Sequence, residues 1–346
     1  MTASCLKTPL ELGYCMPAEW GRQEAIWLSW PHDPTTFTSG VEKVEQTYVQ
    51  IIKYLHRDEF VKLFVLDEEM KKKVSRLLEA AGVDLDRIMF FFFDYADVWF
   101  RDYGPIFVKR KKELAMVHWA FNAWGQKYEE LLKDAQIPRF INEQMGLTCF
   151  EPGIVLEGGS IDVNGKGTLL TTKQCLLNKN RNDSLGKEKI EKYLRDYLGV
   201  SKIIWLNCGI AGDDTDGHVD DLARFVNPST VVCGYEETDD ANGRALKQNY
   251  QILCESTDQD GQKLQIVKLP MPGNVCYDGK RLPASYTNFY IGNGTVLVPT
   301  FKSENDNKAL SILQQQFPKR RVVGIDCLDL VCGFGAIHCI SQQQPA

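Results

Sequence analysis

The sequence predicts an α/β fold in which short strands and amphipathic helices alternate along the chain. The composition is that of an ordinary globular protein, with 44% hydrophobic and 25% charged residues. Apolar runs of strand length recur, and stretches with a helical period lie between them. The 346 residues contain no long linker rich in proline, serine or glycine, so no domain boundary is forced within residues 1–346.

Strands are expected at apolar runs of four to six residues, with helices between several of them. The runs cover residues 25–30, 61–66, 88–93, 114–119, 168–171, 203–206, 231–234 and 295–298. Helices should begin near residues 42, 67, 125, 185, 241 and 304, and Gly199 should cap the end of one of them. This spacing of some tens of residues indicates a pseudo-repeated architecture, although the sequence shows no clear internal repeat.

Charge and cysteine content narrow the class of protein. Lys and Arg number 40 and Asp and Glu 46, a net charge of −6 that disfavours nucleic acid or an anionic membrane as partner. The longest apolar run, residues 88–93, is far too short to span a bilayer. The first residues, Met1 to Lys7, lack a stretch of signal-peptide length, and the 11 cysteines include no Cys-x-x-Cys pair. We therefore expect a cytoplasmic protein with reduced thiols.

Two segments place a carboxylate beside a turn. In residues 99–105, Arg101 and Asp102 follow a phenylalanine-rich run and precede a Gly-Pro turn. Strand ends are where α/β folds place their sites, although an ion pair in a loop explains this pattern about as well. In residues 156–160, Glu157 precedes two glycines, which indicates either backbone packed closely against another group or an ordinary turn.

A third segment, residues 213–221, places carboxylates on both sides of His218. An EF-hand is excluded, because setting Gly217 at loop position 6 puts Gly212 and Ala223 at the two positions that must carry carboxylates. A transition-metal site and a solvated acidic loop remain alternatives. We favour general acid–base chemistry, since carboxylates keep a neighbouring histidine readily protonated near neutral pH.

The fourth segment is a glycine-rich turn near the C-terminus with Cys332, His338 and Cys339. Most cysteines only pack, and composition does not decide which of these two thiols would react. Together the four segments supply carboxylates, a proton-transfer group and a thiol. That set suits attack by a thiolate on a cationic carbon such as that of a guanidinium, whose nitrogens carboxylates can bind in pairs.

These segments resemble the agmatine deiminase family of the guanidino-group-modifying (pentein) superfamily, which also holds arginine and bacterial peptidylarginine deiminases. The resemblance covers essentially the whole chain, with the motifs in the expected order. They are Met16-Pro17-Ala18-Glu19-Trp20, Trp30-Pro31-His32, Trp99-x-Arg101-Asp102-x-Gly104-Pro105, Leu156-Glu157-Gly158-Gly159, Asp214-x-Asp216-Gly217-His218-x-Asp220 and Ile337-His338-Cys339-Ile340-Ser341-Gln342-Gln343.

The resemblance implies a single-domain α/β propeller of five pseudo-symmetric ββαβ modules. It also implies that Cys339, rather than Cys332, is the nucleophile and that His218 is the general acid and base. Asp102 and Asp220 would bind the guanidinium.

The resemblance further implies that Glu157 supports this cluster and that Asp214 and Trp99 line the agmatine pocket. No metal and no organic cofactor is expected, and the assembly is expected to be a homodimer. One residue departs from the family pattern, because Phe334 stands in a loop where members usually have glycine. A phenyl ring there would narrow the pocket or change its access.

The implied activity is hydrolytic deimination of agmatine to N-carbamoylputrescine and ammonia, a step of putrescine and polyamine biosynthesis. It would proceed through a covalent thiouronium on Cys339. Within the superfamily the alternative is arginine or peptidylarginine as substrate. An alternative of another class is a metal-binding module that uses residues 213–221 with Cys339 unreactive, which the incomplete ligand pattern disfavours.

Overall fold

The computed structural model describes residues 7–346, so most of the N-terminal stretch considered for a signal peptide lies outside the described residues. Within the described chain, five sheets have three or four strands and a sixth has two. Each of the five follows one pattern, in which two antiparallel strands are followed by a helix and by a third strand parallel to the second. This repeat confirms the five ββαβ modules, and it is consistent with their arrangement as an α/β propeller.

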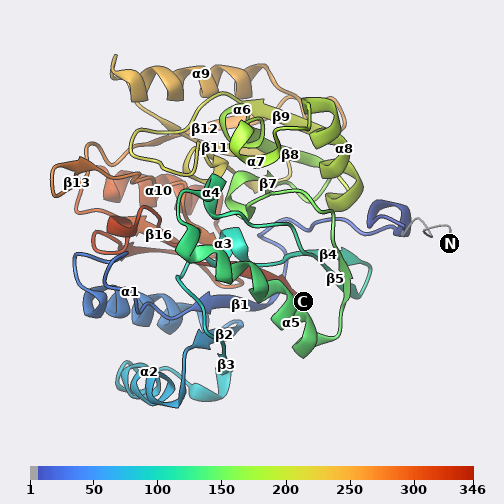
Figure 1. Ribbon diagram of the computed structural model, residues 1–346. Helices are drawn as coiled ribbons and strands as arrows, with labels where there is room; N and C mark the ends of the chain where they lie inside the picture. Colours follow the sequence, from blue (N-terminus) through green and yellow to red (C-terminus); the bar gives the residue numbers. More distant parts are fainter. Residues whose placement is uncertain (1–6) are drawn as a thin grey trace.

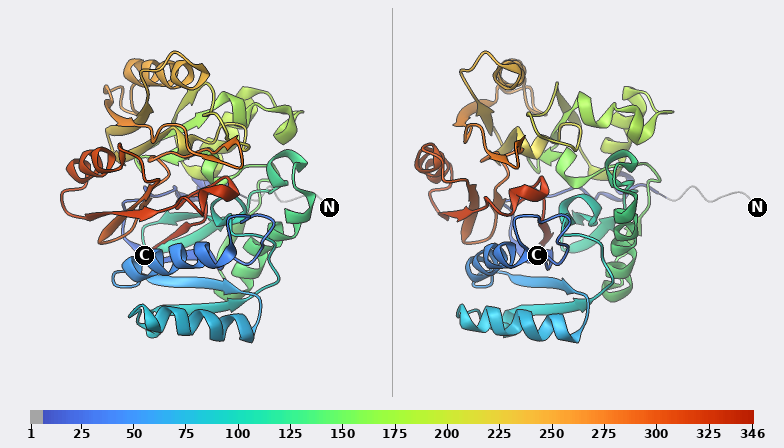
Figure 2. Two further views of the ribbon diagram at one scale, coloured as in Figure 1. Left: turned by 90° about the vertical axis from the view of Figure 1, so that its left-hand side faces the viewer. Right: turned by 60° about the vertical axis from the view of Figure 1, so that its left-hand side comes forward.

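Module 1 joins the two ends of the chain, because the C-terminal strand pairs antiparallel with the first strand. The C-terminus accordingly lies near the blue N-terminal elements in both views of Figure 2. After a further helix, the chain adds a parallel edge strand to this sheet. The elements of module 1 are β18 (Gln342–Pro345), β1 (Gln23–Ser29), α1 (Val41–Leu55), β2 (Phe60–Val65), α2 (Glu68–Ala80) and β3 (Ile88–Phe92).

The other four modules follow in chain order. Module 2 is β4 (Ile106–Arg110), β5 (Glu113–Val117), α5 (Ile137–Met145) and β6 (Thr148–Phe150). Module 3 is β7 (Asp162–Val163), β8 (Thr168–Thr172), α8 (Lys187–Leu198) and β9 (Lys202–Leu206). Module 4 is β10 (Ala223–Asn227), β11 (Thr230–Tyr235), α9 (Ala241–Glu255) and β12 (Gln265–Pro270). Module 5 is β15 (Tyr290–Ile291), β16 (Thr295–Thr300), α10 (Asp306–Gln316) and β17 (Arg321–Asp326).

Short elements complete the described chain. Single turns of helix precede or follow several strands, and one two-stranded hairpin lies between modules 4 and 5. These elements are η1 (Leu10–Leu12), η2 (Leu85–Arg87), α3 (Phe100–Tyr103), α4 (Ala123–Gln126), η3 (Glu129–Gln136), η4 (Gly158–Ser160), α6 (Lys173–Leu176), α7 (Lys179–Asn182), η5 (Val219–Asp221), η6 (Val331–Gly333) and the hairpin β13 (Cys276–Tyr277) with β14 (Lys280–Arg281).

The elements expected from apolar periodicity are largely confirmed. Each of the strands expected above is present, with ends that shift by at most about two residues, the usual uncertainty of boundaries. Gly199 caps α8 in the left-handed conformation (φ 68°, ψ 32°), and its N–H donates to the Arg195 carbonyl. The helix expected near residue 125 is different. The single turn α4 lies there, with Trp124 and Gly125 outside helical geometry; the 3₁₀ helix η3 follows from Glu129, and α5 begins at Ile137.

Strand β18 shows why the remaining strands were not expected. Its sequence is polar, yet its residues are buried. Gln344 Oε1 accepts hydrogen bonds from Trp27 Nε1 at 3.0 Å and from Lys62 Nζ at 2.8 Å, so the amide is satisfied inside the protein. Hydrophobicity patterns cannot reveal such a strand, because its burial depends on partners more than 280 residues away.

The apolar core lies mainly between neighbouring modules. One cluster contains Ile26 of module 1 and Val298 of module 5, and a second contains Val117 of module 2 and Leu169 of module 3. The longer helices, among them α2, α8, α9 and α10, lie at the periphery of the molecule (Figure 1). No helix among residues 7–346 is long and apolar enough to cross a membrane.

The segments that link the modules meet in a buried polar network rather than in apolar core. Glu19 Oε2 lies 2.7 Å from Arg224 Nη2, 2.9 Å from His338 Nε2 and 3.7 Å from Arg101 Nη2. Burial raises the pKa of Glu19, but the charges of Arg224, His338 and Arg101 outweigh it and hold that pKa well below its usual range. The network fixes the segments that enter modules 1, 2 and 4 relative to one another.

Candidate active site

The site is built from one short segment of each module, the segment directly before its first strand. We call these the entry segments, at residues 99–103, 157–161, 218–222, 285–289 and 337–341. They carry Asp102, Glu157, His218 with Asp220, Asn288 and Cys339, all of which are buried. These segments are far apart in sequence, and the fold brings their side chains into contact. The structure thus assembles the predicted catalytic cluster at one place.

A cavity of about 280 Å³, here the acidic cavity, opens onto this cluster. Cys339 and Asp102 lie in its wall, and so do Asp214 and Trp99, as the resemblance implied. Its lining contains carboxylates and aromatic rings but no Lys, Arg or His side chain. The lining residues are Asp33, Thr35, Thr36, Asp97, Trp99, Asp102, Trp124, Tyr128, Glu130, Leu131, Asp214, Thr215, Gly333, Phe334, Gly335 and Cys339.

The thiol of Cys339 is 7% exposed and lies among carboxylates. Its sulfur is 3.8 Å from Asp220 Oδ2 and 3.0 Å from Asn288 Nδ2. Burial raises the pKa of the thiol well above its usual range, and the charges of Asp220, Asp221 and Asp102 raise it further. The sulfur is therefore protonated in the free protein at neutral pH. A cation bound in the cavity would favour the thiolate.

His218 and Asp102 form the second part of the cluster. Nδ1 of His218 lies 3.7 Å from Asp102 Oδ1. Burial lowers the pKa of His218, but the Asp102 carboxylate, Cys175 and Glu157 outweigh it and hold this pKa well above the usual range. Burial raises the pKa of Asp102 to about 6, with the charge of His218 opposing and that of Asp220 adding to the rise. At neutral pH the histidine is thus protonated and the carboxyl ionised.

Glycine 159 allows this close approach. A Cβ atom on Gly159 would lie 2.6 Å from His218 Nδ1 and 2.9 Å from Asp102 Oδ1, far inside van der Waals contact. Its N–H also donates to Asp102 Oδ1 at 3.0 Å. The two glycines after Glu157 are therefore explained by backbone crowded against the cluster, which decides between the two interpretations of that motif.

Asp220 is held by a buried relay. Its Oδ2 lies 2.7 Å from Nδ1 of His338, whose Nε2 lies 2.9 Å from Glu19. Burial raises the pKa of Asp220, but its bond to His338 and the charges of His338 and His218 lower it below the usual range on balance. Oδ1 of Asp220 has no protein partner although it is buried. An ionised carboxylate oxygen without a partner beside a thiol is suited to accept an N–H of a cationic substrate.

Glu157 is anchored from behind. Arg181 Nε donates to its Oε1 at 2.6 Å, and both side chains are fully buried. Arg181 also reaches Asp216 Oδ2 at 2.7 Å, which ties the acidic loop to the cluster. Oε2 of Glu157 and Nε2 of His218 are both buried without a partner. Breaking such a buried pair from one side is costly, so Arg181 fixes where Glu157 lies.

Several carboxylates of the acidic loop at 213–221 are held by hydrogen bonds within the protein. Asp213 accepts from the N–H groups of Thr215 at 2.7 Å and Gly217 at 2.6 Å, and Asp214 accepts from Tyr128 at 2.6 Å. The groups that could share a metal combine residues of several modules. They are Glu157, Cys175 and His218, and separately Asp220, Asp221 and Cys339. Among residues 7–346, both groups belong to the cluster around Cys339 rather than to the loop alone.

Trp99 and Phe334 form part of the wall of the acidic cavity. Trp99 is oriented by a 3.0 Å bond from its Nε1 to Asp97 Oδ2. Phe334 adopts the left-handed conformation with φ 71° and ψ 18°, which favours glycine. The departure from the family pattern therefore lies at a strained backbone position in the cavity wall.

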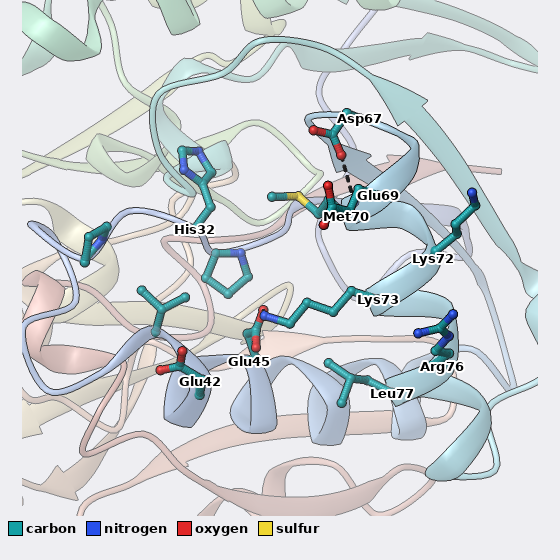
Figure 3. A pocket seen from close by; sticks show the side chains of 13 residues that line it. His32, Glu42, Glu45, Asp67, Glu69, Met70, Lys72, Lys73, Arg76 and Leu77 are labelled. Carbon is teal, nitrogen blue, oxygen red and sulfur yellow. Dashed lines mark hydrogen bonds and ion pairs between the residues drawn. The ribbon is translucent and has the colours of Figure 1, made fainter.

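A larger cavity lies elsewhere, between α1 and α2 (Figure 3). It has a volume of about 970 Å³, but no cysteine lines it. In Figure 3 Lys73 extends towards Glu45, and the two form an ion pair of 2.6 Å. Glu45 also accepts from Trp30 Nε1 at 2.9 Å. Lys73 and Trp30 therefore hold Glu45 in place, and the thiol and the catalytic carboxylates lie at the smaller cavity.

Sequence reasoning missed several residues of the site. Asn288 and Arg181 lie in no motif that carried a chemical argument, and His338 was noted without a role. Asn288 could have been found from the module repeat, since it precedes β15 as Asp102 precedes β4. That signal requires the position of β15, a two-residue strand that periodicity does not reveal.

A thiol, a protonated histidine and paired carboxylates at the centre of a five-module α/β propeller define a guanidino-group-modifying enzyme of the pentein class. The Porphyromonas-type peptidyl-arginine deiminase family model matches residues 15–345. Agmatine deiminase of Ectopseudomonas mendocina is 36% identical over 364 residues, covering 98% of this chain and 97% of that protein. The chain therefore belongs to this deiminase family, several of whose members similar to it are named agmatine deiminase.

Solved structures agree with this assignment. The agmatine deiminase of Enterococcus faecalis superimposes with a TM-score of 0.92 at 35% identity, covering 99% of this chain and 98% of that one. The C. jejuni agmatine deiminase with substrate bound gives a TM-score of 0.86 at 31% identity, covering 96% of each chain. An amidinotransferase from Microseira wollei, at 12% identity and a TM-score of 0.53, shares the fold alone.

Proposed function

We propose that this protein is an agmatine deiminase, which converts agmatine and water into N-carbamoylputrescine and ammonia in putrescine biosynthesis. The observation that carries the proposal is the acidic cavity, which has a thiol in its wall and no basic side chain in its lining. A substrate with a cation at each end and no anion fits that lining. The relatives named agmatine deiminase support the same substrate.

The guanidinium would lie between Asp102 and Asp220. Both carboxylates face the sulfur side of the cluster, and the free Oδ1 of Asp220 is available for a substrate N–H. The delocalised guanidinium is a poor electrophile, so holding it in one orientation is a large part of the catalytic task. Its positive charge also offsets the carboxylates that keep Cys339 protonated, which lowers the pKa of the thiol when substrate binds.

The chemical steps follow from that arrangement. The thiolate of Cys339 attacks the guanidinium carbon, and His218 donates a proton to the departing nitrogen, which leaves as ammonia. The carbon is then bound to sulfur as a thiouronium. His218, now neutral, takes one proton from water, whose oxygen attacks the same carbon. Collapse of this adduct breaks the C–S bond and forms the carbonyl of the product, and the expelled thiolate takes up the second water proton. Glu157 lies behind His218 and supports it through both proton transfers.

Arginine is the less favoured substrate. Its α-carboxylate would enter a cavity whose lining includes Asp33, Glu130 and Asp214 and no cation. The nearby Lys127 is already paired with Asp216 at 2.9 Å. An unpaired buried charge costs several kcal/mol, and even about 3 kcal/mol corresponds to roughly a hundredfold discrimination. Asp214 and Trp99 would line the part of the cavity that holds the agmatine chain.

The test is ammonia release measured in parallel on agmatine, arginine and a blocked arginine peptide. We expect kcat/KM for agmatine to exceed that for arginine by at least about two orders of magnitude. Comparable values, or faster turnover of the peptide, would place the protein with the arginine or peptidylarginine deiminases. The Cys339 chemistry would be unaffected by that result.

We further infer that residues 1–346 act as one catalytic domain, in the cytoplasm, as a homodimer. Pairing of β18 with β1 supports a single unit, because removing either end of the chain would open module 1. A thiol nucleophile favours a reducing compartment. The homodimer rests on the family resemblance. Light scattering after size-exclusion chromatography tests it, and a monomeric mass would contradict it.

A further inference from the structure

Asn288 contacts the sulfur of Cys339 and has no place in the reaction described above. It is fully buried in the entry segment of module 5. Its Nδ2 lies 3.0 Å from Cys339 Sγ and 3.0 Å from Asp221 Oδ1. Its Oδ1 lies 2.9 Å from the His338 backbone nitrogen and 3.3 Å from that of Cys339. The amide therefore spans the turn that carries the nucleophile.

These four contacts determine which way the amide faces. The two backbone N–H groups are donors, so they require an acceptor, and the carbonyl oxygen is the acceptor of an asparagine side chain. The NH₂ group must then face the sulfur and Asp221. One N–H of this group then points to the sulfur of Cys339 and the other to Asp221. The Asp221 carboxylate accepts the second N–H and so holds the amide in this orientation. The orientation thus follows from the hydrogen-bond network.

The sulfur needs such a donor. Asp220, Asp221 and Asp102 all raise the pKa of the Cys339 thiol, as burial does. In the described residues, Asn288 Nδ2 is the side-chain donor within bonding distance of this sulfur, whereas the other polar side-chain contact, Asp220 Oδ2, is an acceptor. The backbone N–H of Ala336 also lowers the pKa of the thiol, but it does not outweigh burial and the carboxylates. The entry segments of modules 2, 3 and 4 contribute carboxylates to the cluster. A neutral amide in module 5 adds a donor without adding another negative charge.

We propose that Asn288 is a catalytic residue whose side-chain N–H donates to the sulfur of Cys339 and stabilises the thiolate. This rests on the proposed function, in which Cys339 is the nucleophile. The bond is strongest while the sulfur is negative, which is before attack on the guanidinium carbon and again when the thiolate is expelled by water. Asn288 also fixes the thiol position through the backbone of residues 338–339.

The Asn288→Asp variant separates donation from packing. Asp keeps an oxygen for the two backbone N–H groups and nearly the same shape, but it removes the NH₂ donor and places a second carboxyl beside Asp221 and the sulfur. Because that carboxyl can add a charge of its own, the rise of the thiol pKa in Asn288→Ala measures loss of the donor alone. Asn288→Ala removes both ends of the amide and provides a second measurement if the first variant does not fold. Asn249→Asp is the matched control. Asn249 is also fully buried and bridges backbone groups at 2.9 Å, but it lies outside the cluster.

The experiment measures alkylation of Cys339 by iodoacetamide as a function of pH. This probe is neutral, so it does not itself change the charge of the acidic cavity. The modified peptide that contains Cys339 is quantified by mass spectrometry, and residual ammonia release from agmatine is measured in parallel. We expect the apparent pKa of the thiol to rise by at least about one unit in both Asn288 variants. Alkylation and kcat near pH 8 should fall about 10- to 100-fold.

An unchanged alkylation profile in the Asn288 variants, or a shift no larger than that of Asn249→Asp, would overturn the proposal. It would do so even if the variants lose activity, because lost packing alone does not raise the thiol pKa. Failure of the underlying function has a different signature. Wild-type protein that still releases ammonia after complete alkylation of Cys339 would show that this thiol is not the nucleophile, and the role of Asn288 would fall with it.

Discussion

Removing the indole N–H of Trp124 should move the acid limb of the pH–activity profile to higher pH. Trp124 Nε1 donates to Asp102 Oδ2 at 2.9 Å, and both residues are buried. Asp102 must be ionised to bind a guanidinium, and its pKa is already raised to about 6, chiefly by burial. Trp124→Phe keeps an aromatic ring in the cavity wall and removes only the donor, so the carboxylate loses part of its stabilisation.

The size of the effect follows from the bond. A hydrogen bond to a charged group contributes about 1.5–3 kcal/mol, and about 1.4 kcal/mol corresponds to one pKa unit. The pKa of Asp102 should therefore rise from about 6 to roughly 7–8. The pKa rises because the lost N–H stabilised the ionised carboxylate, so its removal favours the protonated acid. At pH 7 the ionised fraction of Asp102 then falls from about 0.9 to between roughly 0.5 and 0.1.

The assay measures kcat/KM for agmatine by ammonia release between about pH 5 and 9, at about every half pH unit. This parameter is chosen because it reports the ionisations of the free enzyme. Trp119→Phe is the matched control, because Trp119 is also buried but its indole N–H has no partner. Its acid limb should stay in place. A Trp124→Phe profile that is lowered uniformly, with the acid limb unmoved, would refute the assignment of that limb to Asp102.

Three further results are expected. Cys339→Ala should abolish turnover, whereas Cys332→Ala should retain most of it, because of these two thiols only Cys339 lines the acidic cavity. The measurements are ammonia release by both variants and, for the wild type, detection by mass spectrometry of an acid-quenched adduct on Cys339. Equal activities of the two variants would overturn the choice of nucleophile. Phe334→Gly should relieve a backbone strain of about 1 kcal/mol, because residue 334 has a left-handed conformation, and it should also widen the acidic cavity. We therefore expect kcat/KM for a blocked arginine peptide to rise relative to kcat/KM for agmatine. If the ratio of these two values is unchanged, the phenyl ring does not control access to the cavity. Exhaustive chelation with EDTA should leave ammonia release unchanged, since the substrate brings its own positive charge. If EDTA abolished the activity and zinc or manganese restored it, the carboxylates of the cluster would have to be metal ligands.

Local sequence was sufficient for much of the fold. The strands at 61–66 and 203–206 and the helix capped by Gly199 follow from apolar periodicity and from a glycine that tolerates positive φ. These features depend on a few neighbouring residues, which is why they can be read without the rest of the chain. The four chemical segments were also found locally, since carboxylates, imidazole and thiol are visible as residue types.

The choice between Cys332 and Cys339 was not a local property. Residue reasoning left both thiols open, and only the family resemblance favoured Cys339. In the structure Cys332 Sγ donates to the Leu328 carbonyl at 3.3 Å, whereas Cys339 lies between Asn288 and Asp220. What distinguishes the two thiols is therefore their surroundings, which come from modules 4 and 5.

The sequence by itself determined which chemical groups are available and where most helices and strands begin. The tertiary structure decided that Asp102, Glu157, His218 and Cys339 share one cluster, that Asn288 joins them, and that the polar strand β18 closes module 1. Each of these outcomes depends on contacts between segments that are 50 or more residues apart in the sequence. Such pairing is set by the packing of whole modules against one another, and no local pattern of residues records it.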